Sequence, residues 1–217
     1  MSDIFQEVDE EVRREQFKKL WDRWGNHFLA AAVLVVLGIG GWRAWEWYEM
    51  QKAQQAGAAF DSALSLALAG KHDDAEAAFA KIAQDSPAGY RLLARMQEAA
   101  ELAARDRPAA VKAYDAIATD YSMGHTLQDL AAVRAALLVV DSAPFSEIQA
   151  RLEPITGTDH PFRHSARELI ALAAWRAGDV ASARGWFEKI ISDPETPNGI
   201  RSRIEVLMAL ADADGKG

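Results

Sequence analysis

Two stretches of this chain, far apart in the sequence, carry the same pattern. Residues 69–82 read AGKHDDAEAAFAKI, and residues 177–190 read AGDVASARGWFEKI. Both begin with Ala-Gly, and alanine, phenylalanine, lysine and isoleucine then recur at identical positions. Self-similarity of this kind indicates that the chain is built from structural repeats.

The segment between the two stretches holds further, weaker copies of the pattern. Each copy contains three apolar residues on one helix face. The second lies one helical turn after the first, and the third lies one turn after the second. The four triplets are Ala75, Phe79 and Ile82; Ala110, Tyr114 and Ile117; Ile148, Leu152 and Ile155; and Ala183, Phe187 and Ile190. The steps between them are roughly 35 to 38 residues, which is typical of tetratricopeptide-like helix–turn–helix units. We therefore predict an all-α solenoid of about four helical hairpins.

The residue types in each copy have physical reasons. Gly70 and Gly178 suit the end of a first helix, where a positive φ is needed. The small alanine allows close approach of two helices, and Phe79 and Phe187 fill the space between neighbouring hairpins. No single hairpin can bury its apolar face, so stacking must supply the core. The expected helices span residues 56–69, 73–84, 88–104, 108–119, 126–140, 145–154, 162–177 and 180–191, followed by a capping helix over 198–212.

An uncharged run, WGNHFLAAAVLVVLGIGGW, precedes the repeats from Trp24 to Trp42. As a helix it would extend roughly 28 Å, close to the hydrocarbon thickness of a bilayer. Aromatic clusters flank both ends, and indole and phenol rings favour the headgroup region. We predict a transmembrane helix that runs without a break into the first repeat helix. The alternative is a buried core helix.

Charges flanking this run predict its orientation. Five cations precede it and two follow it before Lys71; they are Arg13, Arg14, Lys18, Lys19 and Arg23, then Arg43 and Lys52. An excess of lysine and arginine marks the cytoplasmic side. The run lacks a small-residue cleavage site at its end, which favours a signal anchor over a cleaved signal peptide. We expect a cytoplasmic tail (1–23), an anchor (24–48) and a repeat domain (49–217) on the far side of the membrane, which in a bacterium is the periplasm.

Composition excludes several classes of function. The net charge is −8, so the chain lacks the clustered positive charge that nucleic-acid binding requires. There is no cysteine, which excludes disulfides, thiolate metal sites and cysteine nucleophiles. Serine-nucleophile, zinc-protease, P-loop and dinucleotide motifs are also missing. We expect no enzymatic activity and no cofactor.

The whole pattern resembles a known family, the YfgM-like ancillary subunits of the bacterial Sec translocon. The resemblance rests on the tail DIFQEVDEEVRREQ, the motif KLWDRWGN, one membrane helix that ends GGWRAWEWY, and the Ala-rich repeats. It implies a single-pass protein associated with the SecYEG channel and with a membrane-anchored, PpiD-type prolyl isomerase. Such proteins are thought to hand emerging chains to periplasmic chaperones, and the family offers no catalytic residues to carry over.

Histidines are the remaining candidates for metal chemistry. His160 and His164 lie four residues apart, a spacing that allows a shared metal on a helix. Pro161 is expected to start the helix, which leaves His160 outside it, and no third ligand is evident. We expect surface or capping roles for both. His72 follows a turn glycine and is expected to be exposed.

Tetratricopeptide-like arrays usually bind peptides in the groove lined by their first helices. Some related arrays hold a terminal carboxylate with a lysine–asparagine clamp, but Asn26 and Asn198 are the only asparagines and neither is suitably placed. Basic residues of the first helices are candidate groove contacts: Arg91, Arg95, Arg134, Arg163 and Arg167. The alternative is that these arginines lie on solvated helix faces. Trp175 and Trp186 are expected in the core.

These observations favour a non-enzymatic adapter that is anchored in the membrane and binds partner proteins or emerging polypeptides. The alternative is a structural scaffold for another envelope complex, such as the cytochrome-maturation or division machinery. Co-purification with those complexes instead of with Sec would distinguish the two. Gly38, Gly40 and Gly41 allow another helix to approach the anchor closely, so self-association is left open.

Overall fold

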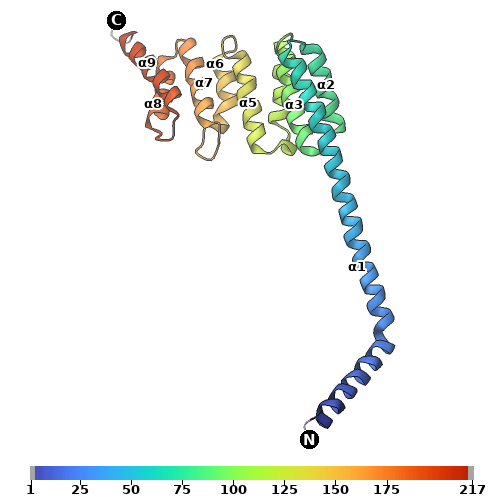
Figure 1. Cartoon of the computed structure of the whole chain (residues 1–217). Helices are drawn as coiled ribbons and strands as arrows, with labels where there is room; N and C mark the ends of the chain where they lie inside the picture. Colours follow the sequence, from blue (N-terminus) through green and yellow to red (C-terminus); the bar gives the residue numbers. More distant parts are fainter. Residues whose placement is uncertain (1–2, 215–217) are drawn as a thin grey trace. The chain divides into compact units, whose positions relative to one another are not determined.

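The computed structural model describes the backbone of residues 3–214 and the side chains of residues 18 and 21–211. Every regular element within residues 3–214 is helical, as expected. The α-helices are α1 (Asp3–Leu68), α2 (His72–Asp85), α3 (Ala88–Leu102), α4 (Arg107–Ala118), α5 (His125–Val139), α6 (Phe145–Leu152), α7 (Arg163–Arg176), α8 (Val180–Ser192) and α9 (Asn198–Asp214). Two short 3₁₀ turns, η1 (Tyr121–Met123) and η2 (Glu153–Ile155), lie in connections (Figure 1).

The chain divides into two compact units, Met1–Gln54 and Gln55–Gly217. The described part of the first unit belongs to α1, which continues into the second unit as far as Leu68. The expected unbroken passage from the apolar run into the first repeat helix is therefore confirmed.

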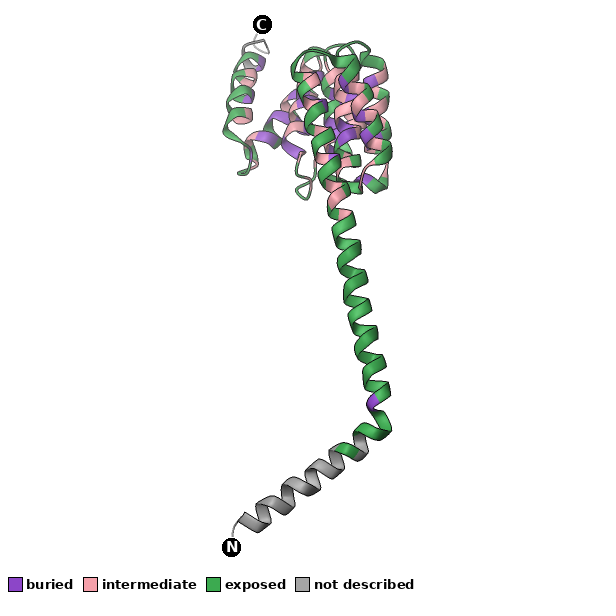
Figure 2. Ribbon diagram, turned by 45° about the vertical axis from the view of Figure 1, so that its right-hand side comes forward, coloured by how far each residue is buried: buried purple, intermediate pink, exposed green. Residues whose placement is uncertain are grey.

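Helix α1 is long and apolar enough, from Trp21 onward, to cross a membrane, and none of its most apolar window is buried. The side chains of Trp24 and Trp42 are 50% and 75% exposed, and the residues between them form a continuous exposed stretch apart from Gly25 (Figure 2). The alternative of a buried core helix is therefore wrong. Three of the cations counted for orientation, Arg13, Arg14 and Lys19, lie outside the described side chains.

The second unit buries the repeated triplets. All twelve triplet side chains are buried, and Phe79 and Phe187 are among the largest that are fully buried. They lie on α2, α4, α6 and α8 (α6 with its following turn η2), which are the second helices of the four predicted hairpins. Burial at every repeat position confirms that these helices share one role in packing.

The core is divided along the array. One cluster joins α1, α2 and α3 around Phe79; a second joins α3, α4 and α5 around Tyr114; a third extends from α5 to α9 around Phe187. Each cluster is made by helices that are neighbours in the sequence, as expected of a solenoid. Helix α9 covers the end of the third cluster with Ile204 and Ala211, which confirms its predicted capping position.

Turn residues behave as their backbone freedom predicts. Gly70 has a φ of 74° and Gly178 a φ of 76°, and each lies two residues after the last residue of a first helix. A third glycine with positive φ, Gly124, precedes α5. Side chains with a Cβ are strained in this region, which explains why the two best-matching repeats both carry glycine at the turn.

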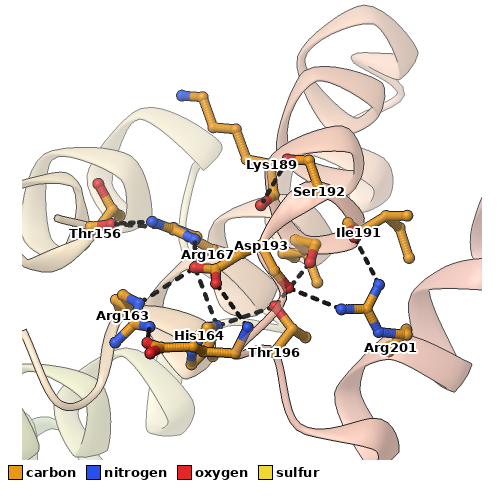
Figure 3. Close-up of polar contacts among 12 residues, drawn as sticks. Thr156, Arg163, His164, Arg167, Lys189, Ile191, Ser192, Asp193, Thr196 and Arg201 are labelled. Atoms are coloured by element: carbon orange, nitrogen blue, oxygen red, sulfur yellow. Dashed lines mark hydrogen bonds and ion pairs between the residues drawn. The ribbon is translucent and has the colours of Figure 1, made fainter. Parts of the chain in front are cut away.

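A polar cluster of Arg163, Arg167, Asp193 and Glu195, which we call the Asp193 cluster, links α7 to the connection between α8 and α9 (Figure 3). Arg167 donates from Nη1 to Asp193 Oδ2 at 2.8 Å, and Arg163 donates from Nε to the same oxygen at 3.3 Å. Arg163 also pairs with Glu195, and Arg167 donates twice to the backbone carbonyl of Thr156. The cluster therefore ties α7 to the connection that precedes it and to the connection between α8 and α9.

Opposing effects set the protonation of Asp193. Burial alone would raise its pKa, but the Glu195 backbone N–H and the guanidinium groups of Arg167 and Arg163 outweigh burial and lower the pKa from 3.8 to about 2. The carboxylate is therefore charged in the folded protein at any pH above that value.

Replacing the repeated phenylalanines tests whether the core is divided. Both F79A and F187A should lower the free energy of unfolding by about 3 to 5 kcal/mol, because each leaves a cavity in a fully packed site. In F79A, amide hydrogen exchange should accelerate mainly in α1 to α3, and in F187A mainly in α7 to α9, as seen by mass spectrometry of the full-length protein. L68A removes a side chain that is 90% exposed and is the matched control. Equal acceleration along the whole array in both variants would contradict a segmented core.

Acid should weaken the repeat domain through Asp193. A depressed folded-state pKa contributes stability above the unfolded pKa of 3.8, and this is lost as the pH falls toward about 2. The calorimetric unfolding midpoint of the detergent-solubilised chain should therefore fall over this range. The unfolding midpoint of D193N should be lower than that of the wild type at neutral pH, and it should fall less as the pH is lowered. D85N is the control, since Asp85 is exposed and has no hydrogen-bond or ion-pair partner among the described side chains. If the unfolding midpoint of D193N fell with acid as much as that of the wild type, Asp193 would be excluded as a source of the acid sensitivity.

Candidate protein-binding groove

A groove lies in the second unit between the first helices of three successive hairpins. Its volume is about 260 Å³, and it is lined by α1, α3, α4 and α5. The lining residues are Phe60, Leu93, Met96, Gln97, Ala100, Tyr114, Leu127, Leu130 and Arg134.

Helical periodicity places these side chains together. On α3 the lining positions follow three- and four-residue steps from Leu93 to Ala100, and on α5 they follow the same steps from Leu127 to Arg134. Residues at such steps share one face of a helix. Phe60 closes the α1 side, where its ring packs edge-on against Phe79 with centroids 5.2 Å apart.

The groove has a buried floor and exposed walls. Met96 and Tyr114 are buried at its base, whereas Leu93 is 46% exposed on its wall. Burial raises the pKa of Tyr114, Arg134 partly offsets this, and Glu101 adds to the rise. The phenol is therefore neutral at physiological pH, and the base of the groove carries no negative charge.

The lining is chemically simple. Among the described lining residues, Arg134 is the only charged one, and Gln97 and the Tyr114 hydroxyl are the other polar groups. The volume falls below the range of roughly 300 to 1,000 Å³ that is usual for small-molecule sites. It suits a few side chains of a bound polypeptide, and the groove offers no nucleophile paired with a base.

The five predicted arginines divide into two groups. Arg91 and Arg134 are exposed, and neither has an ion-pair partner among the described side chains. Arg134 lines the groove and Arg91 does not. Arg95 is instead occupied within the fold, donating to Asp120 at 2.6 Å and contacting Met123 Sδ at 3.3 Å.

Arg163 and Arg167 are buried in the Asp193 cluster. For these two residues the alternative of a solvated helix face is wrong, because both guanidinium groups neutralise Asp193 across the last hairpin. They line a shallower hollow beside Lys189 and Glu195, not the groove between α1, α3 and α5.

Histidine placement also differs from expectation. His164 is buried and its Nδ1 lies 3.2 Å from the Thr196 hydroxyl, so a surface role for it is wrong. His160 lies outside α7, as expected, and its Nδ1 is 2.7 Å from Asp129 Oδ2. His72 is exposed, as expected, and it pairs with Glu101 at 2.7 Å. No cluster of three metal-ligating residues occurs among the described side chains.

Tryptophan placement agrees with expectation. Trp186 is buried, and Trp175 is partly buried with its ring centroid 6.4 Å from that of Phe187.

Sequence reasoning found Arg134 but missed the apolar lining around it. Two of the missed residues could have been predicted from the sequence, because Leu127 and Leu130 precede Arg134 at helical spacing and so share its helix face. What the pattern could not show is that Leu93, on the facing side of α3, remains exposed beside this lining.

Comparison with known proteins relates this chain to a repeat family and to a named relative. Residues 18–207 match the family described as "Tetratricopeptide repeat-like domain". The chain is 24% identical over 188 residues to a Haemophilus influenzae protein named "Ancillary SecYEG translocon subunit", which covers 84% of this chain and 88% of that relative. No solved structure matches the chain significantly. The resemblance drawn from the tail, anchor and repeats is thus confirmed, and because the family match extends from α1 into α9, the chain belongs to the tetratricopeptide repeat-like domain family.

Proposed function

We propose that this protein is a non-enzymatic, membrane-anchored adapter that acts beside the Sec translocon and binds partner proteins or emerging polypeptides. The observation that carries the proposal is the pairing, in one chain, of an exposed apolar helix long enough to span a bilayer with a repeat domain that has an open apolar groove. The name of the Haemophilus relative supports the Sec translocon as the place of action.

The proposed arrangement is a single pass through the bacterial inner membrane. Residues 1–23 form the cytoplasmic tail, residues 24–48 the signal anchor, and residues 49–217 the periplasmic repeat domain. The excess of cations before the anchor supports this orientation. A periplasmic groove would meet polypeptides as they leave the channel.

The proposed partners are the SecYEG channel, a PpiD-type prolyl isomerase and periplasmic chaperones that receive the emerging chain. Anchoring supports this role physically, because confinement to the same membrane raises the effective concentration of two partners. Individually weak contacts, such as those of a small open groove, then suffice for association. Self-association through the anchor would be compatible with the same role.

Crosslinking tests the proposed place of action. A photoreactive residue introduced singly at positions from Trp45 to Lys52 should capture a translocon subunit or the isomerase in intact cells. The same residue introduced on α9, at Val206, is the matched control, because Val206 is exposed and lies at the far end of the repeat array. Capture of neither partner from any position near the anchor would count decisively against the proposal.

Cysteine labelling tests the orientation, and the absence of native cysteine makes each introduced thiol unique. Lys71 and Lys18 are both exposed and lie on either side of the apolar run. In spheroplasts, a membrane-impermeant maleimide should label K71C directly and K18C only after lysis. The reverse pattern would place the repeat domain in the cytoplasm.

A further inference from the structure

We propose that the groove between α1, α3 and α5 selects apolar polypeptide segments that carry one acidic side chain, whose carboxylate pairs with Arg134. The inference rests on the proposed function, since it names the class of segment that the adapter binds. The apolar lining accounts for the affinity of such a segment, and the arginine accounts for its selectivity.

The apolar lining provides a surface that the fold itself leaves partly uncovered. Leu93 is 46% exposed, and Leu127 and Leu130 are only partly buried. Below them Met96 and Tyr114 form a packed floor. Apolar side chains of a bound segment would remove this surface from water, which favours binding in proportion to the apolar area covered. A volume of about 260 Å³ admits a few such side chains.

Arg134 provides the charge that an acidic partner would meet. It is the only charged residue of the lining, and no described carboxylate pairs with it. The chain is rich in carboxylates, since acids outnumber bases 32 to 24, and three of the five predicted arginines already pair with one. Arg95 holds Asp120, and Arg163 and Arg167 hold Asp193. The guanidinium of Arg134 is therefore available to a carboxylate from outside.

The position of Arg134 strengthens this pairing. It lies one helical turn after Leu130 on the same face of α5, so its guanidinium borders an apolar surface. Once a segment covers that surface, water is displaced and the attraction between the two charges increases. A planar guanidinium also matches a carboxylate with two parallel hydrogen bonds. A lysine at the same place in the segment would be repelled.

Peptide binding to the full-length protein in nanodiscs tests the inference. The probes are short fluorescent peptides with an identical leucine pattern, blocked at both ends, that differ at one position: glutamate, glutamine or lysine. The wild type should bind the glutamate probe about tenfold more tightly than the glutamine probe, and the lysine probe most weakly. The preference should shrink at high salt, because a partly exposed ion pair is screened.

Two matched variants assign the effect to the groove. R134Q should bind the glutamate and glutamine probes equally, whereas R91Q should retain the wild-type preference. Arg91 is also exposed and has no ion-pair partner among the described side chains, but it lies outside the lining. Both are surface substitutions, so folding is preserved, and retained helical circular dichroism checks this.

Several results would overturn the inference. One is equal binding of the glutamate and glutamine probes by the wild type. Another is a loss of preference in R91Q that matches the loss in R134Q. A third is that a neutral probe with a free carboxyl end binds more tightly than the blocked glutamate probe. The last would show that the groove recognises chain termini instead of acidic side chains. The proposed function fails separately, if the anchor-proximal crosslinks capture no translocon partner, and that result leaves the peptide measurements unaffected.

Discussion

The structure depends on one packing constraint: a helical hairpin with an apolar face on each side cannot bury both by itself. The triplets on α2, α4, α6 and α8 satisfy this constraint by packing between first helices, which removes Phe79, Tyr114, Ile148 and Phe187 from water. Alanines at 75, 110 and 183 are fully buried and let the backbones approach. Stability is therefore a sum over neighbouring units, and the array requires a cap, which α9 supplies.

The same constraint leaves one face of the first helices free. The triplets of the second helices are buried in the core, whereas α3 and α5 keep leucines that are only partly covered, namely Leu93, Leu127 and Leu130. An exposed apolar stripe costs free energy in an isolated protein and is typical of a binding surface. Helix α1 contributes Phe60 to this groove and also carries the apolar run, so a single element serves both proposed roles, attachment and binding.

Electrostatics decides which arginines remain available. A buried guanidinium must meet a carboxylate or several carbonyl oxygens, because leaving it unpaired costs several kcal/mol. Arg163 and Arg167 meet Asp193, Glu195 and the Thr156 carbonyl, and they stabilise the last hairpin instead of binding a partner. Arg134 lies where the fold leaves an open apolar surface, and no carboxylate among the described side chains pairs with it. Five similar residues in the sequence thus acquire different roles from their surroundings.

The sequence by itself determined the helical repeat, the buried triplets, the turn glycines and the apolar run, because each follows from local periodicity or backbone preference. Gly70 and Gly178 needed only the conformational freedom of glycine, and Phe79 and Phe187 needed only their spacing. Tertiary structure alone decided that His164 is buried beside Thr196, that Arg167 reaches Asp193, and that Leu93 faces Arg134 across a groove. These pairings join residues from different elements of the chain, and their geometry depends on how helices and connections pack, which no single helix encodes.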